Sequence, residues 1–141
     1  MVLDMRSSPQ EVYASEYLVM EVDEARSTVR IRRTAAPFPT SESHVEEWQA
    51  LLSVIDRQFT RERYGLLLDL REAPSRNDPA FEQVAQAMRP RIRGGFRRTA
   101  VVVKTAAGML QLRRFERQSP LSTPEDVFFN EEEALAFLRG A

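Results

Sequence analysis

The residues with the clearest chemical meaning follow an apolar run near the middle of the chain, where residues 66–79 read LLLDLREAPSRNDP. Asp78 precedes a helix predicted to start at Pro79. Proline lacks a backbone N–H, and at the first helical position this loss costs nothing. Backbone amides at the start of a helix attract anions, so this acidic side chain stands where an anionic ligand would otherwise bind. The spacing predicts that Asp78 is the N-cap of the helix.

A second chemistry, the binding of a small anion, is predicted for the carboxyl ends of the strands. Arg71 and Arg76 follow the strand expected at residues 64–70, and Thr105 follows the strand expected at residues 99–103. Open α/β sheets bind ligands at this edge, and arginine makes bidentate contacts to carboxylate or phosphate. In the alternative, Arg71 pairs with a neighbouring acid and Thr105 only caps the helix that follows it.

Positive charge is concentrated in one part of a chain whose net charge is −1. Residues 89–117 hold nine cations and a single acid. The candidate basic patch consists of Arg89, Arg91, Arg93, Arg97 and Arg98. This segment predicts an acidic protein partner, unless its arginines pair with acids of the same chain. Nucleic-acid binding is the weaker interpretation, because the sequence pI of about 5.9 lies far below the values typical of such domains.

Catalytic and metal-binding chemistry finds little support in the residue types. The chain has no cysteine and a single histidine, His44, at a predicted helix start where we expect it to be exposed. The usual zinc sites therefore cannot form, and a catalytic triad would depend on one exposed side chain. The glycines match neither the dinucleotide fingerprint nor the P-loop. We expect no enzyme activity, no cofactor and no metal.

The elements that must position these residues are predicted in the order ββαβαβαβα. Strands are expected at residues 16–23, 27–33, 64–70, 99–103 and 126–129, and helices at residues 44–60, 79–89, 105–117 and 130–139. Buried strands that alternate with helices predict an α/β fold with a mainly parallel five-stranded sheet, covered by about four helices, and with the first hairpin at or near an edge. In the first helix, capping-box spacing of Ser43 and Glu46 marks the start and Trp48 is predicted to lie in the core.

The helix predicted at residues 105–117 has the poorest pattern. Met109 and Leu110 cluster on one side of it, whereas Leu112 and Phe115 point elsewhere. A second apolar face of this kind would meet another surface, and it predicts a homodimer.

The length of 141 residues predicts one domain, at residues 15–141, after a flexible lead-in at residues 1–14. The amino-terminal residues have no apolar core of signal-peptide length, and nowhere do 18 apolar residues run together. The lack of cysteine is compatible with a reducing compartment. We expect a cytoplasmic protein without a membrane span.

Three segments together resemble the STAS superfamily, in particular the SpoIIAA-like stand-alone domains of bacteria. They are LLLDLREAPSRNDPAFE, GFRRTAVVVKTAAGMLQLRR and the closing DVFFNEEEALAFLRG, and the resemblance covers about residues 15–140. It implies a non-catalytic switch or scaffold that binds partner proteins. Relatives of the fold in the CRAL-TRIO group carry lipids, which implies a small anionic or lipid ligand as the alternative.

The phosphoswitch branch of this family carries an Asp-Ser pair at the start of the helix after the third strand, and a partner kinase phosphorylates the serine. Counted from Asp69, the two positions fall on Asn77 and Asp78. Asp78 is either a fixed acidic stand-in for the serine or only an N-cap, and Ser75 is a displaced candidate phosphoacceptor. The resemblance implies a partner or ligand surface made of Arg71, Ser75, Arg76, Asn77 and Asp78. A pocket larger than about 300 Å³ would favour the ligand.

Overall fold

The computed structural model describes residues 9–118, 120 and 123–140. Within them the strands are β1 (Gln10–Ala14), β2 (Leu18–Asp23), β3 (Thr28–Arg33), β4 (Gly65–Asp69), β5 (Thr99–Val102) and β6 (Glu125–Phe128). The helices are α1 (Ser41–Gln58), α2 (Pro79–Arg93), α3 (Ala106–Gln118) and α4 (Glu131–Leu138), with a short 3-10 turn, η2 (Arg61–Arg63), before β4.

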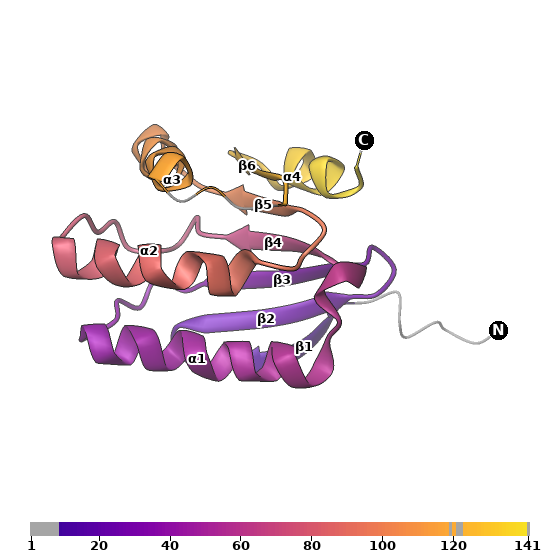
Figure 1. Ribbon diagram of the computed structural model, residues 1–141, viewed down its shortest axis with the longest axis horizontal. Helices are drawn as coiled ribbons and strands as arrows, with labels where there is room; N and C mark the ends of the chain where they lie inside the picture. Colours follow the sequence, from indigo (N-terminus) through magenta and orange to yellow (C-terminus); the bar gives the residue numbers. More distant parts are fainter. Residues whose placement is uncertain (1–8, 119, 121–122, 141) are drawn as a thin grey trace.

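The strands form one sheet in the order β1-β2-β3-β4-β5-β6 (Figure 1). β1, β2 and β3 pair antiparallel, and β3 to β6 run parallel. The predicted α/β class and the mainly parallel arrangement of the later strands are confirmed. The parallel strands all end at one edge of the sheet, called the carboxyl edge below.

The sheet has six strands rather than the five expected, because β1 forms within the segment predicted as a lead-in. This edge strand carries little apolar alternation, since Gln10 and Glu11 are exposed. It is held by pairing with β2 and by the Tyr13 hydroxyl, which donates to Glu47 of α1 at 2.8 Å. Residues 1–8 of the expected lead-in lie outside the described residues.

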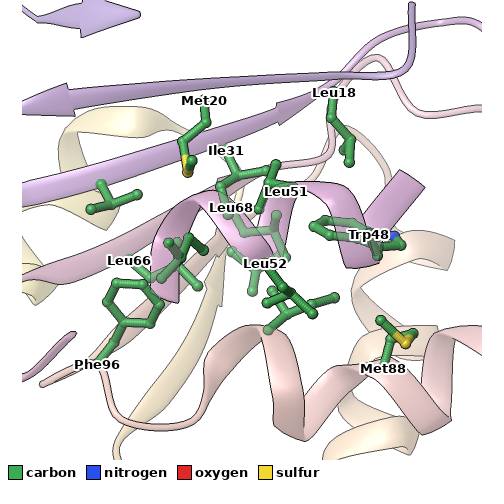
Figure 2. Packing of buried hydrophobic residues seen from close by; sticks show 14 of the residues in the cluster. Leu18, Met20, Ile31, Trp48, Leu51, Leu52, Leu66, Leu68, Met88 and Phe96 are labelled. Atoms are coloured by element: carbon green, nitrogen blue, oxygen red, sulfur yellow. The ribbon is translucent and has the colours of Figure 1, made fainter. Parts of the chain in front are cut away.

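Helices cover both faces of the sheet, which explains the continuous apolar character of β4. Leu66 and Leu68 pack in the larger core with α1, α2 and α3, whereas Leu67 packs against α4 on the other face. Figure 2 shows Leu66 and Leu68 pointing into the same space as Leu51 and Leu52 of α1. All five residues of β4 are buried, as expected for a parallel strand covered twice.

Two helix boundaries differ from those predicted by three residues or more. α1 starts at Ser41, and its capping box joins Thr40 and Ser43, each backbone N–H bonding to the other's hydroxyl, rather than Ser43 and Glu46. α2 continues past Pro90 to Arg93. Pro90 has no N–H and cannot donate an intrahelical hydrogen bond. The turn that follows it buries Ile92 in the core.

The buried face of α3 is not the one expected. Leu112 and Phe115 belong to the core, whereas the Leu110 side chain is 67% exposed. The apolar residues that suggested a homodimer are therefore used within the protomer. The difference lies in the rotation of α3 about its own axis. Packing against neighbouring elements sets this rotation, and the composition of the helix does not.

Candidate functional site

A cavity of about 510 Å³ opens at the carboxyl edge, between α1, α2, α3 and the loop at residues 70–76. Its buried lining combines apolar side chains with four polar ones. The apolar side chains include Trp48, Leu68, Met88, Ile92, Val103 and Phe115, and the polar ones are Arg33, His44, Arg89 and Arg93. Figure 2 shows two of these side chains, Trp48 from α1 and Met88 from α2. The cavity lies at the edge where the sequence predicted a ligand, and it exceeds the 300 Å³ expected for one.

Exposed residues complete the lining, so the cavity reaches solvent. They include Ser75 in the loop and Lys104 and Thr105 just after β5. The Thr105 hydroxyl accepts a hydrogen bond from the Gly108 N–H at 3.0 Å, and Thr105 thus caps α3 as the alternative interpretation predicted. Lys104 was not singled out as a site residue. Its position directly after a buried strand was the available signal.

Arg71 pairs with a neighbouring acid, as the second interpretation of that residue predicted. Its Nε and Nη2 donate to the two carboxylate oxygens of Asp69 at 3.0 and 2.8 Å. Arg30 donates to the same carboxylate at 2.9 Å, and both arginines also contact Glu131. Burial alone would raise the pKa of Asp69, but the hydrogen bonds from Arg71 and the charges of Arg71 and Arg30 outweigh it and lower that pKa.

Asp78 is the N-cap of α2, as predicted. Its Oδ2 accepts from the backbone N–H of Phe81 at 3.1 Å. Both carboxylate oxygens also accept from Arg76, whose Nε and Nη2 lie 2.9 Å away, and these hydrogen bonds are the main cause of the lowered pKa of Asp78. The start of α2 is therefore already occupied by a side chain of the same chain.

Arg76 joins the loop to three other parts of the structure. Its guanidinium lies 4.9 Å from the centre of the Phe81 ring and donates to the carbonyl of Phe38 at 3.3 Å. Its own carbonyl accepts from Gln111 of α3 at 3.1 Å. The loop over the cavity is consequently tied to α2, α3 and the segment before α1.

His44 is buried, and the prediction that it is exposed is wrong. Its ring stacks between Phe38 and Phe81, with ring centres 4.3 and 5.0 Å away. Burial, together with the charges of Arg33 and Arg76, lowers the pKa of His44 to about 4. The neutral ring forms part of the cavity wall.

The five arginines of the candidate basic patch do not form one surface. Arg89 and Arg93 are buried and both pair with Glu125 of β6, at 2.8 Å for Arg89. Arg93 belongs to the turn by which α2 continues past Pro90. Burial lowers the pKa of Arg93 to about 10. Arg97 and Arg98 donate to backbone carbonyls at 3.2 and 3.3 Å, so internal pairing accounts for most of this segment.

A second hollow, a groove of about 710 Å³, runs along the other side of the loop and α3. Its lining includes Ser75, Arg76, Asn77, Leu110 and Arg114. Three of the five residues predicted as a partner surface therefore meet there.

Across residues 9–118, 120 and 123–140, no three acidic or histidine side chains lie close enough together to hold a metal ion. None of the helices in this part of the chain combines the length and the apolar character needed to cross a membrane.

An antiparallel edge that leads into four parallel strands, with three helices on one face and one on the other, defines a SpoIIAA-like fold. The chain is similar to a solved structure described as an uncharacterized protein of the DUF3478 family with a SpoIIAA-like fold, from Shewanella loihica PV-4. The match covers 93% of this chain and 92% of that chain, with a TM-score of 0.53 and 15% identity. No protein-family model and no curated protein matches the chain. The predicted SpoIIAA-like fold is thus confirmed, and at this identity the likeness concerns the fold alone.

Proposed function

We propose that this chain is a non-catalytic binding module that takes one amphiphilic anion into the cavity at the carboxyl edge. The observation that carries the proposal is the cavity itself, whose volume of about 510 Å³ lies within the range of small-molecule sites. The buried apolar side chains of its lining suit a hydrocarbon tail. A binding module of this kind needs no catalytic group. We assign the neutral, stacked His44 a structural role in the cavity wall.

The charge at the mouth selects an anionic head group. Lys104 is exposed there, and no acidic side chain in the described part of the chain lies within ion-pair distance of it. Arg71 and Arg76 also line the cavity, but they already pair with Asp69 and Asp78. The buried Arg89 and Arg93 share Glu125, and Arg33 donates to backbone carbonyls. Glu72, the exposed acid in the lining, pairs with Arg32. We therefore assign the carboxylate or phosphate of the ligand to Lys104.

Isothermal titration with dodecanoate tests this proposal. We expect one molecule to bind per chain, and dodecanol to bind more weakly. Ala85→Phe places a ring in the cavity and should abolish binding, whereas Ala136→Phe on α4, outside the lining, should not. Lys104→Glu should weaken binding by about tenfold or more, as loss of a charged contact does.

Circular dichroism would confirm that each variant is folded. Equal affinity of the wild type and folded Ala85→Phe would refute the proposal, since the ligand would then bind elsewhere. Equal affinity of Lys104→Glu would refute the assignment of the head group.

A protein-interaction module is the second candidate, and the groove along α3 favours it. Exposed Ser75 and Asn77 lie in this groove beside the exposed Leu110. Under this candidate, an acidic partner in the cytoplasm contacts the groove, and either Ser75 is phosphorylated or Asp78 acts as a fixed charge. Asp78→Ser keeps most of the capping and restores a hydroxyl. If it is not phosphorylated in cell extract and captures the same proteins as the wild type, the switch interpretation fails.

A further inference from the structure

The outward side of α3 combines an exposed leucine with three arginines. This surface, called the α3 outer face, consists of Ala106, Ala107, Leu110, Arg113, Arg114 and Arg117, all of which are exposed. Their spacing of three and four residues places them on one side of the helix, opposite the buried Leu112 and Phe115. α3 is therefore amphipathic in an unusual sense, because its solvent side carries both a large apolar side chain and a cluster of cations.

The α3 outer face has no acidic residue of its own. Arg113 lies 3.5 Å from Asp126 and Arg114 lies 2.9 Å from Glu82, both as solvent-exposed pairs. Pairs of this kind contribute little and exchange readily with other anions. Arg117 has no acidic side chain within ion-pair distance among the described residues. The face therefore offers positive charge to an anionic surface.

The same helix forms a wall of the ligand cavity. Leu112 and Phe115 line the cavity from the inner side of α3, and Gly108 and Gln111 line both the cavity and the groove outside it. Figure 1 shows α3 at one end of the molecule, over the end of the sheet formed by β5 and β6. A ligand that leaves or enters beside α3 would thus pass next to the arginines.

We propose that the α3 outer face docks onto an anionic lipid surface, with Leu110 in the apolar boundary and the arginines among the head groups. This inference rests on the proposed function and names the source of its ligand, because an amphiphile with an apolar tail resides mainly in bilayers rather than in water. Cations that flank a large apolar side chain are typical of helices that lie in the membrane interface. One leucine gives a weak and reversible contact, so binding should require anionic lipid.

Co-sedimentation with vesicles tests this inference. The vesicles contain either phosphatidylcholine alone or equal parts of phosphatidylcholine and phosphatidylglycerol. The test variant carries Arg113→Gln, Arg114→Gln and Arg117→Gln. The control variant carries Arg57→Gln, Arg63→Gln and Arg139→Gln, which removes the same charge from exposed positions on other elements. Each cation near an anionic surface strengthens binding roughly fivefold.

We expect the wild type to bind only the anionic vesicles and to dissociate as salt is added. The test variant should bind about a hundredfold more weakly, because it loses three cations and their effects add in free energy. The control variant should bind nearly as well as the wild type. Failure of the wild type to bind, or equal losses in the two variants, would overturn the inference. If the wild type instead bound a polyglutamate peptide and ignored the vesicles, the face would belong to an acidic protein.

The vesicle experiment is separable from the test of the cavity. Ala85→Phe should lose dodecanoate and still bind anionic vesicles, because it leaves the α3 outer face unchanged. The triple test variant should lose the vesicles and still bind dodecanoate in solution, because none of its three arginines lines the cavity. Loss of both kinds of binding in both variants would refute the separation of the two surfaces.

Discussion

Lowering the pH should destabilise the fold through His44, because the slot that holds its ring favours the neutral form. The ring lies between Phe38 and Phe81 at 4.3 and 5.0 Å, and burial and two nearby arginines lower its pKa from 6.5 to about 4. Between these two pH values the unfolded chain binds a proton on His44 and the folded chain does not. The free energy of unfolding must therefore fall as the pH falls through this window.

The size of the effect follows from the two pKa values. Each pH unit of the window corresponds to about 1.4 kcal/mol. Relative to neutral pH, titration of His44 lowers the free energy of unfolding by about 2 kcal/mol near pH 5. The loss reaches about 3 kcal/mol at the lower pH at which the folded form is also protonated. A loss of this size is a large fraction of the stability of an ordinary domain.

Urea unfolding can be followed by the fluorescence of Trp48, the only tryptophan. His44→Phe places an apolar ring in the same slot and removes the titrating group. No other histidine is present. The carboxylates are the same in both proteins, so their contributions to the pH dependence cancel in the comparison. We expect the wild type to lose about 2 kcal/mol more than the variant between about pH 8 and about pH 5. Identical pH dependence of the two proteins would show that His44 is protonated in the fold, against our reasoning.

Three further predictions concern stability and can be measured by the same urea unfolding. Asp78→Ala should lower the free energy of unfolding while Asp78→Ser retains most of it, because serine also caps a helix; equal losses would mean that the charge matters rather than the cap. Glu125→Gln should cost about 3 to 5 kcal/mol, because it removes the carboxylate that two buried arginines share, and a near-neutral result would contradict that pairing. Leu112→Ala should cost about 2 to 5 kcal/mol and Leu110→Ala less than about 0.5 kcal/mol, and the reverse order would mean that α3 is rotated.

Local patterns predicted the parts of the fold that depend on neighbours in sequence. The continuous apolar runs at β4 and β5 indicated strands covered on both faces, and all their residues are buried. The Asp78 cap depends on an amide three residues away, and the Arg71 pair on an acid two residues away. Gly140, the residue directly after the last predicted helix, has a positive φ of 79° that suits glycine.

Contacts between distant segments decided the features that the sequence did not reveal. β1 is a half-exposed edge strand whose pairing depends on β2, and nothing in its own pattern required it. The rotation of α3 and the continuation of α2 past Pro90 both depend on what lies against them. Likewise, His44 meets Phe81 and Arg93 meets Glu125 across more than 30 residues of chain. The cavity exists only where three helices and a loop meet, so its volume could not be anticipated from residue types.

The claim that the cavity takes an amphiphilic anion is tested most directly by the indole N–H resonance of Trp48. This side chain lines the cavity and is the only tryptophan, so its signal is assigned without ambiguity. Titration with dodecanoate, kept below the concentration at which it forms micelles, should shift the resonance until one equivalent is bound, and Ala85→Phe should abolish the shift. An indole resonance that stays unchanged in the wild type at excess dodecanoate would contradict the account.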